Sequence, residues 1–393
     1  MGKRVIVLGG CGHVGLPLAV TFASRGADVT IVDVDEAAVG RTNAGQVNFM
    51  ERGAEELLRR HLGKNLRATT DRAAVADAAV VVCVVGTPID EHLNPQVDKL
   101  LMVARELQPY LRAGQLFVLR STVYPGATMK LAAWFDEHVP GLDVAFCPER
   151  VAQGYAVHEI ESLPQIVSGA TVRAAERAGE LFALVAPKII RTSPIEAELG
   201  KLFCNAWRYI TFAAANQFYA LCAANGIDYA RVHAAITEEY PRMKSLPMAG
   251  FAAGPCLFKD TMQLAAFYNN EFSLGQSAML VNEGFPRVLM QQLRPLGLAD
   301  KTVGLLGLAF KGENDDTRES LAFKMKKLLA LEARRVLCTD EYVRGPEVLP
   351  LAQVLAEADV LVVCAPHRRY KTLTPRQTTL DPWNLLGRGG LLA

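Results

Sequence analysis

The sequence predicts an α/β protein in which two parallel-sheet domains are joined by a long central helix and a helical region. Two observations predict this fold class. Apolar runs of strand length alternate with helical stretches in the first and last parts of the chain. Between these parts, residues 193–226 form one uninterrupted helical pattern. Because 393 residues exceed one ordinary core, we predict domains at 1–190, 191–298 and 299–393.

Composition excludes several functional classes. Half of the residues are hydrophobic, and the formal net charge is +1 with a pI of about 7.6. We therefore expect neither nucleic-acid binding nor attraction to an anionic membrane. No apolar run reaches transmembrane length, and the eight cysteines contain no CxxC pair. These features predict a cytoplasmic protein without a metal site or a disulfide framework.

The first domain opens with a glycine-rich turn between a strand, residues 4–8, and a helix. The turn reads GxGxxG, and Asp33 ends the next strand 18 residues after the last glycine. Such a turn places a pyrophosphate on a helix N-terminus, and Asp33 would bind the adenosine ribose and repel a 2′-phosphate. This Rossmann-like pattern therefore predicts NAD as the cofactor. The loop residues assigned to it are Gly10, Gly12, His13, Val14 and Gly15, with His13 expected to be exposed rather than catalytic.

Polar residues follow three further apolar runs of the first domain. Thr87, Thr122 and Glu149 lie at or just after the ends of these predicted strands. In open α/β sheets the ligand site lies beyond the carboxyl ends of the strands, so all three are expected at one crevice. Each threonine could instead cap a helix. Glu149 follows a proline and is harder to explain as structure.

The long central helix is predicted from its ends and from its apolar sides. Ser193-Pro194-Ile195-Glu196 resembles a capping box, and Asn225-Gly226 resembles a C-cap. Because the helix is apolar nearly all round, it requires burial on several sides, which predicts a spine between domains or a homodimer interface. Glu198, Lys201 and Asn205 fall on one face. The alternatives for this face are an ordinary Glu–Lys surface pair and an oxyanion-stabilising Lys–Asn pair.

A candidate nucleophile lies in the turn between Gly250 and Asp260. Cys256 follows small residues that allow close approach, and Lys259 lies three positions further on. A neighbouring ammonium favours the reactive thiolate, so Cys256 could attack a carbonyl. A buried structural cysteine before a helix would give the same local pattern.

The third domain repeats the alternation of strands and helices, with strands expected at 302–308, 335–340 and 360–364. Lys311 and Arg318 lie on the loop that leaves its first strand. These cations suit phosphate recognition, although a solvated charged loop would have the same composition. The sequence thus predicts two Rossmann-like halves, without an obvious repeat between them.

Together these motifs resemble the UDP-glucose/GDP-mannose dehydrogenase family over nearly all 393 residues. The resemblance implies an N-terminal NAD domain, a central dimerisation region and a C-terminal nucleotide-sugar domain. It also implies oxidation of the C6 alcohol of a UDP-sugar to a carboxylate in two NAD-dependent steps, through a cysteine-bound intermediate. The resemblance assigns roles to individual positions of this chain.

On the resemblance, Cys256 is the nucleophile, and Lys201 and Asn205 hold the developing oxyanion. Thr122 and Asp260 would position the catalytic water, and Thr87 and Thr122 are also assigned to the cofactor site. The resemblance further assigns thioester hydrolysis to Glu149 and a cofactor contact to Arg318. The residues expected to contact the substrate are Glu149, Lys201, Asn205, Gly254, Lys259 and Lys311.

Three departures from the family pattern bear on the site. Pro255 replaces the usual serine or histidine, Ala253 replaces a glycine, and Gln153 stands where some relatives have a glutamate. The substrate stays open, since residues 205–209 favour a UDP-N-acetylhexosamine and Cys-x-x-Lys-Asp favours UDP-glucose. Two alternatives for the function are a two-electron β-hydroxyacid dehydrogenase and a non-catalytic NAD or UDP-sugar sensor. The first leaves the third domain unexplained, and the second predicts a lost nucleophile.

Overall fold

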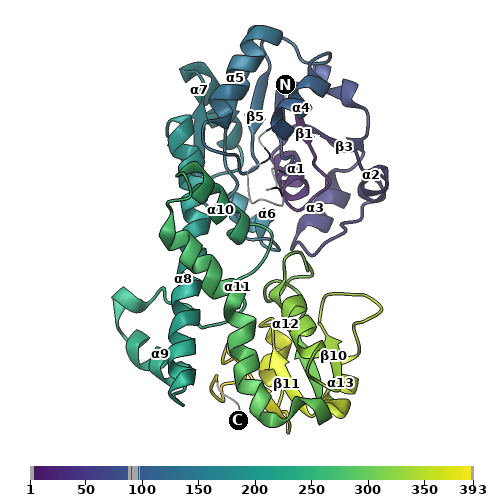
Figure 1. Cartoon of the computed structure of the whole chain (residues 1–393). Helices are drawn as coiled ribbons and strands as arrows, with labels where there is room; N and C mark the ends of the chain where they lie inside the picture. The colour runs from purple at the N-terminus through teal and green to yellow at the C-terminus, as the bar shows by residue number, and fades with distance from the viewer. Residues whose placement is uncertain (1–3, 87–89, 91–95, 97, 391–393) are drawn as a thin grey trace. The chain divides into compact units, whose positions relative to one another are not determined.

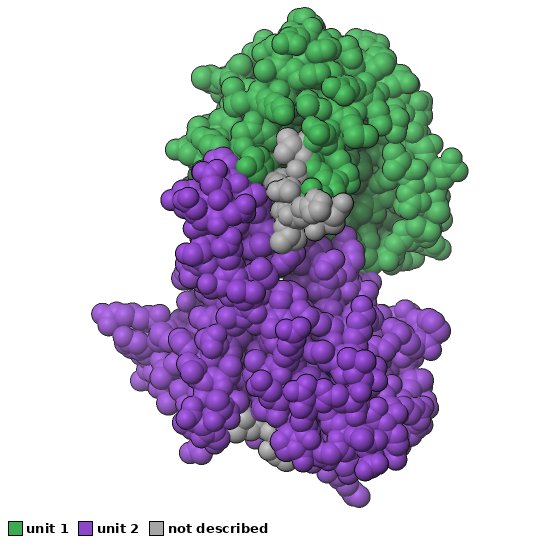
Figure 2. All heavy atoms as spheres, in the orientation of Figure 1, with its two compact units in different colours: residues 1–204 green, residues 205–393 purple. Residues whose placement is uncertain are grey.

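The computed structural model describes residues 4–86, 90, 96 and 98–390, and the chain forms two compact units. Unit 1 comprises residues 1–204 and unit 2 residues 205–393 (Figure 2). The boundary falls inside the long helix α8 (Pro194–Ala224), so this helix contributes to both units (Figure 1). The three predicted functional domains are a finer division and stay a prediction.

Unit 1 contains an eight-stranded sheet with the order β3-β2-β1-β4-β5-β6-β7-β8. The first six strands of this order pair in parallel, β7 is antiparallel to β6, and β8 is parallel to β7. The strands are β1 (Arg4–Leu8), β2 (Asp28–Val32), β3 (Leu66–Thr69), β4 (Val80–Cys83), β5 (Leu116–Leu119), β6 (Asp143–Phe146), β7 (Gln165–Gly169) and β8 (Ile189–Arg191). The order β3-β2-β1-β4-β5-β6 is that of a dinucleotide-binding sheet.

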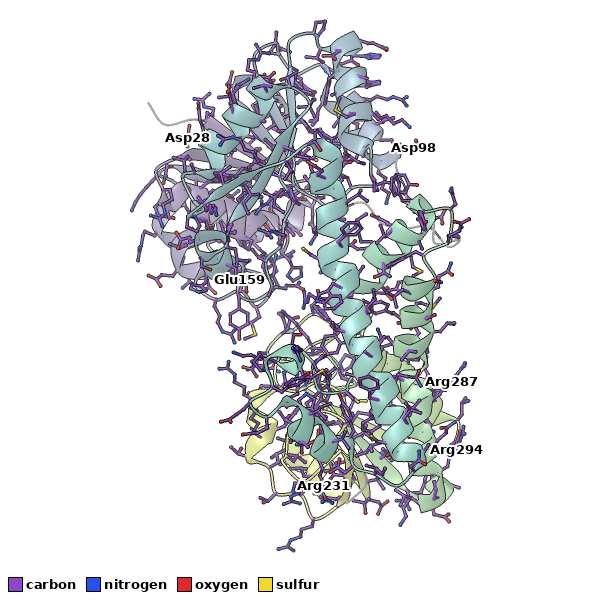
Figure 3. The ribbon with its side chains drawn as sticks, turned by 90° about the vertical axis from the view of Figure 1, so that its left-hand side faces the viewer. Asp28, Asp98, Glu159, Arg231, Arg287 and Arg294 are labelled. Atoms are coloured by element: carbon purple, nitrogen blue, oxygen red, sulfur yellow. The ribbon has the colours of Figure 1, made fainter. Side chains whose placement is uncertain are left out.

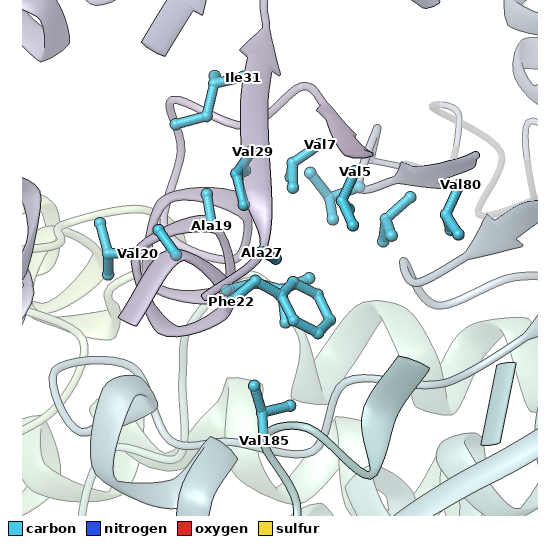
Figure 4. Packing of buried hydrophobic residues seen from close by; sticks show 14 of the residues in the cluster. Val5, Val7, Ala19, Val20, Phe22, Ala27, Val29, Ile31, Val80 and Val185 are labelled. Carbon is cyan, nitrogen blue, oxygen red and sulfur yellow. The ribbon is translucent and has the colours of Figure 1, made fainter. Parts of the chain in front are cut away.

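Both faces of this sheet are buried. Along β1, Val5 and Val7 join an apolar cluster with Phe22 (Figure 4), whereas Ile6 joins a second cluster with Phe117. Successive side chains of a strand point to opposite faces, so burial on both sides requires a continuous apolar run. The helices of unit 1 before α8 are α1 (Gly15–Ser24), α2 (Glu36–Asn43), α3 (Ala54–His61), α4 (Asp98–Leu107), α5 (Ala127–His138), α6 (Ala156–Ser162) and α7 (Val172–Phe182).

Helix α8 begins and ends where the sequence predicts. At its start, the Ser193 N–H and Oγ–H both donate to Glu196 Oε2 at 2.8 Å. At its end, Gly226 has φ +67°, and the Ile227 N–H donates to the Cys222 carbonyl at 2.9 Å. This is the Schellman pattern, in which a left-handed glycine closes the last turn. Among the described residues, no helix is both long and apolar enough to cross a membrane.

Unit 2 contains a four-stranded parallel sheet with the order β10-β9-β11-β12. Its strands are β9 (Thr302–Leu306), β10 (Arg335–Thr339), β11 (Val360–Val363) and β12 (Thr378–Leu380). Its remaining helices are α9 (Tyr229–Thr237), α10 (Leu257–Phe267), α11 (Ser273–Leu293), α12 (Leu321–Ala330) and α13 (Leu351–Glu357). Helix α11 buries Phe285 and Leu289, whereas Arg287 is exposed and projects outward, as does Arg294 just beyond the helix (Figure 3).

The two sheets share one structural feature, a carboxylate hydrogen-bonded to a loop, which is not visible as a repeat in the sequence. In unit 1, Asp33 follows β2, and its carboxylate accepts the N–H of Cys11 in the loop after β1, at 2.9 Å. In unit 2, Asp340 follows β10, and its carboxylate accepts the N–H groups of Leu308 and Ala309 in the loop after β9, at 2.6 and 3.1 Å. In each unit an acid at the end of the second strand fixes the loop after the first.

The Asp340 carboxylate also bonds a buried histidine. His367 Nδ1 accepts the Glu313 N–H at 3.0 Å, so its Nε2 is the nitrogen that donates to Asp340, at 3.1 Å. Burial raises the pKa of Asp340, but the hydrogen bonds from His367 and from main-chain N–H groups outweigh burial and lower the pKa to about 2. The pair thereby holds both ends of the loop that carries Lys311.

Candidate active site

The glycine loop of unit 1 has the geometry of a dinucleotide-phosphate site. A Cβ on Gly10 would lie 2.7 Å from the Val7 carbonyl oxygen, and a Cβ on Gly15 would lie 2.4 Å from the Gly10 Cα. By contrast, a Cβ on Gly12 would meet no atom within 4 Å, so the loop is open there. Val14, the N-cap of α1, forms no side-chain capping bond. The helix dipole therefore favours an anion at this end.

A cavity beside the glycine loop suits the adenosine half of NAD. The cavity has a volume of about 140 Å³, and its lining includes Gly9, Asp33 and apolar side chains such as Val85 and Leu107. Asp33 is only partly buried and lies where a ribose would bind. His13 differs from the prediction, because it is half-buried with its ring centroid 4.1 Å from that of Phe49. These residues fit NAD, which would lie along the loop with its ribose at Asp33.

The predicted crevice residues of unit 1 differ in their surroundings. Thr87 lies outside the described residues. Thr122 lies between β5 and α5 and is half-buried. Glu149 follows β6 and is 8 % exposed. Its carboxylate accepts hydrogen bonds from the Arg120 guanidinium and from the N–H groups of Arg150 and Val151, at 2.7 and 2.8 Å for the last two. Glu149 is therefore held in a fixed position.

Arg120 is a residue of this region that sequence reasoning missed. Its side chain is buried and donates to the carbonyls of Cys147 and Pro148, at 3.2 and 3.3 Å, and to Gln165 Oε1. It thereby bonds the turn after β6, which carries Glu149, to the start of β7. The only sequence signal was a cation at the end of an otherwise apolar strand.

On α8, Glu198 has a different role from Lys201 and Asn205, the other two polar residues of its face. Glu198 is buried and accepts the N–H groups of Gly126 and Thr128, at 2.6 and 2.9 Å, and the Thr128 hydroxyl at 2.6 Å. It thus caps the N-terminus of α5. Lys201 is 8 % exposed, and no residue in the described part of the chain bonds its ammonium. Asn205 is also buried and follows Lys201 by four residues, on the same side of the helix.

Unit 2 brings together four of the predicted catalytic and substrate residues. Cys256 is exposed and is the N-cap of α10. One turn into this helix, the buried Asp260 accepts a hydrogen bond from Asn205 Nδ2 and pairs with Lys259 Nζ at 2.6 Å. A helix N-terminus favours a thiolate, because the free N–H groups and the helix dipole stabilise negative charge. Cys256 therefore has the exposure and the surroundings of a nucleophile rather than of a buried structural cysteine.

The loop after β9 borders the Cys256 turn. Gly254 has φ +102°, its N–H donates to the Glu319 carbonyl at 3.4 Å, and an added Cβ would lie 2.5 Å from the Phe310 ring. Lys311 Nζ lies 5.8 Å from the centroid of the same ring. The hydrogen bond with Asp316 raises the pKa of Arg318. Among the described residues, no cluster of three or more His, Cys, Asp or Glu side chains could hold a metal.

Arg318 interacts with Cys256 as well as with Asp316. The charge of the Cys256 thiolate is a further, smaller cause of the raised pKa of Arg318. Arg318 Nη2 bonds Asp316 at 2.6 Å, which fixes the side chain on its own loop. The cofactor contact predicted for Arg318 stays a prediction, and its electrostatic interaction with the Cys256 thiolate was not foreseen.

Comparison with known proteins identifies the family. Models of three domains of the UDP-glucose/GDP-mannose dehydrogenase family match the chain: the NAD binding domain at residues 3–185, the central domain at 195–284 and the UDP binding domain at 304–387. The chain is 31% identical to the UDP-N-acetyl-D-mannosamine dehydrogenase of Pyrococcus horikoshii, over 94% of this chain and 91% of that protein.

Solved structures agree with this assignment. A structure of UDP-D-ManNAc dehydrogenase from Pyrococcus horikoshii has a TM-score of 0.90 and 28% identity, covering 98% of this chain and 96% of that one. A UDP-glucose dehydrogenase from Pyrobaculum islandicum has a TM-score of 0.89 and 29% identity, covering 97% and 94%. The chain therefore belongs to the UDP-glucose/GDP-mannose dehydrogenase family and is an NAD-dependent nucleotide-sugar dehydrogenase.

Proposed function

We propose that this protein oxidises the C6 alcohol of a UDP-N-acetylhexosamine, such as UDP-N-acetyl-D-mannosamine, to the uronic acid with two equivalents of NAD. The observation that carries the reaction type is Cys256, an exposed thiol at a helix N-terminus one turn from the buried Asp260, which bonds the buried Asn205 and pairs with the half-buried Lys259. The substrate class is supported by the relatives that are UDP-N-acetyl-D-mannosamine dehydrogenases. UDP-glucose is the second candidate, because a similar solved structure is a UDP-glucose dehydrogenase.

Cys256 is proposed to act after the alcohol has become an aldehyde. Its thiolate sulfur forms a C–S bond with C6 of the aldehyde, and the carbonyl oxygen becomes the oxyanion of a thiohemiacetal. NAD, when bound along the glycine loop, supplies the acceptor for one hydride in each of the two oxidations. After the second oxidation, Cys256 holds the sugar as a thioester.

Lys201 and Asn205 are proposed to stabilise the oxyanion. Both are buried, and they lie one turn apart on α8. In a water-excluded site a preorganised ammonium and amide N–H stabilise developing negative charge far more than they would in solvent. The Lys201 ammonium suits this role, since no described residue bonds it. Asn205 is kept in one orientation by the hydrogen bond that it donates to Asp260.

Hydrolysis of the thioester completes the proposed reaction. Water adds to C6, the C–S bond breaks, and Cys256 leaves as the thiolate while the sugar leaves as the carboxylate and the two protons of the water are released. Asp260 and Thr122 are proposed to orient this water. Glu149 is proposed to assist from its fixed position beside Arg120. The substrate contacts assigned to Gly254, Lys259 and Lys311 stay proposals too.

The experiment that tests the proposal counts NADH per sugar. A limiting amount of UDP-N-acetyl-D-mannosamine, UDP-N-acetylglucosamine, UDP-glucose or GDP-mannose is incubated with excess NAD, with the wild type and Cys256→Ser. Cys204→Ser is the matched control, because Cys204 is also exposed. Two NADH per sugar, abolished in Cys256→Ser and retained in Cys204→Ser, are expected. One NADH per sugar, unaffected by Cys256→Ser, would contradict the thioester route.

We also propose that the protein is a homodimer through α8. Phe203, Trp207, Phe218 and Leu221 are 54, 62, 41 and 57 % exposed. At about 100° per residue these four positions fall within about 60° on one face of the helix. A continuous apolar stripe of this kind is typical of an interface. A cytoplasmic location is likewise proposed, on the ground that all eight cysteines are free.

A further inference from the structure

The seven residues from Gly250 to Cys256, here called the Cys256 loop, are bonded at their start to a chain of buried amides. The Gly250 N–H donates to Asn216 Oδ1 of α8 at 2.8 Å. Asn216 Nδ2 donates to Asn282 Oδ1 of α11 at 2.9 Å, and Asn282 Nδ2 donates to the Tyr209 carbonyl at 2.9 Å. Asn216 and Asn282 are both buried, so each of these bonds is protected from water. The loop start is thereby tied to two helices.

An aromatic ring packs against the same glycine. A Cβ on Gly250 would lie 2.3 Å from Cε2 and Cζ2 of Trp383, so the indole lies directly against the loop backbone. Trp383 is fixed in turn, because its Nε1–H donates to the Cys364 carbonyl at 3.2 Å and its ring makes an edge contact with Phe212. A side chain at position 250 and an indole at position 383 cannot both be accommodated.

The far end of the loop is held in a similar way. Phe310 lies against Gly254, and the Gly254 N–H bonds the Glu319 carbonyl. Phe251 and Ala252, between the two glycines, are buried, whereas Cys256 is exposed. The loop is therefore constrained from Gly250 to Gly254, and these constraints end two residues before the thiol.

We propose that Asn216 and Trp383 are positioning residues that fix the start of the Cys256 loop and thereby hold the Cys256 thiol at the N-terminus of α10. The proposal rests on the proposed role of Cys256 as the nucleophile. Displacement of a reacting group by about 1 Å can lower a rate by about 100-fold. The contacts of Asn216 and Trp383 with Gly250, six residues before Cys256, can therefore affect turnover. Neither residue touches the reacting atoms.

The test enlarges the side chain at position 250 and reduces the side chain at position 383, singly and together. Gly250→Ala, Trp383→Leu and the double variant are compared in kcat, with the UDP-sugar that gives two NADH, and in the alkylation rate of Cys256 by iodoacetamide. We expect Gly250→Ala to lower kcat at least tenfold with an unchanged KM for NAD, and to slow alkylation. Trp383→Leu in that background should restore kcat to within threefold of Trp383→Leu alone. If the two substitutions instead lower kcat independently, so that their effects multiply in the double variant, the proposal is overturned.

Two further comparisons keep the test decisive if Gly250→Ala fails to fold. Asn216→Ala should lower kcat and slow Cys256 alkylation, whereas Asn225→Ala, which removes an exposed amide just beyond the end of the same helix, should change neither. Trp383→Phe should retain most activity, because an aromatic ring remains beside Gly250. A lowered melting temperature with unchanged kcat and alkylation would show a purely structural role and contradict the proposal.

The alkylation of Cys204 in the same samples reports general exposure of thiols. Alkylation of Cys256 does not depend on catalysis, so it separates the two hypotheses. A wild type whose turnover survives Cys256→Ser contradicts the proposed function, whereas equal Cys256 alkylation in all variants contradicts only the positioning roles.

Discussion

Replacing Glu149 by glutamine should destabilise unit 1 by about 3 kcal/mol. The carboxylate pairs with the Arg120 guanidinium and accepts two main-chain N–H groups, and both side chains are buried. Removing one partner of a buried ion pair costs about 3–5 kcal/mol, because the other charge is left uncompensated. The lower value applies here, since Arg120 keeps acceptors in the carbonyls of Cys147 and Pro148. The glutamine NH₂ group would also face another donor in either orientation.

Thermal unfolding measures this effect directly. About 3 kcal/mol in a unit of this size corresponds to a fall in melting temperature of about 6–12 °C. Glu161→Gln is the matched control, because Glu161 forms an exposed pair with Arg25 at 2.8 Å. Such surface pairs contribute about 0–1 kcal/mol. A melting temperature of Glu149→Gln within 2 °C of the wild type would refute the reasoning, and kcat measured below both transitions would separate stability from chemistry.

Three further predictions follow. Because the folded pKa of Asp340 is about 2, below its ordinary value of 3.8, its stabilisation of about 2 kcal/mol should be complete above pH 4 and lost as pH falls through 2. In urea unfolding, the difference in free energy of unfolding between the wild type and Asp340→Asn should therefore shrink as the pH is lowered from 4 to 2. A difference that stays constant over this range would contradict the prediction. Lys201→Met should lower kcat about 10²–10³-fold, as loss of an oxyanion donor does, and a loss below tenfold would exclude that role. Trp207→Asp should convert a homodimer to a 42.7 kDa monomer in light scattering. Leu331→Asp should not, because Leu331 is apolar and even more exposed than Trp207 but lies off the stripe. A dimer that survives Trp207→Asp would exclude this interface.

Much of the fold was predictable because its strands are buried on both faces. Continuous apolar runs identified β1, β2, β4, β5 and β6, and likewise the three main strands of unit 2. The strands that were missed, β3, β7, β8 and β12, lack such a continuous apolar run. In β3, for example, exposed Arg67 lies between buried neighbours, which interrupts the apolar pattern.

The candidate site was predictable where its chemistry is local and not where it depends on tertiary pairing. Cys256 and Asp260 lie one turn apart, so the sequence places them together. The partner of Glu149 is 29 residues away in Arg120, and Glu198 caps a helix 70 residues before it. Nothing in the spacing of these residues indicates which side chains meet, because that is decided by the packing of β5, β6, α5 and α8.

The hydrogen bond between Asp33 and the glycine loop has a consequence for any attempt to change the cofactor preference from NAD to NADP. Removing the acid is the obvious way to admit a 2′-phosphate, but the same carboxylate accepts the N–H groups of Cys11 and Asp35, at 2.9 and 3.2 Å. An Asp33→Ala enzyme would thus lose, with one substitution, both the repulsion of a 2′-phosphate and the hydrogen bonds that order the glycine loop. A variant redesigned for NADP needs a replacement acceptor for the Cys11 N–H, such as the oxygen of an asparagine or serine side chain at position 33, before basic residues are added.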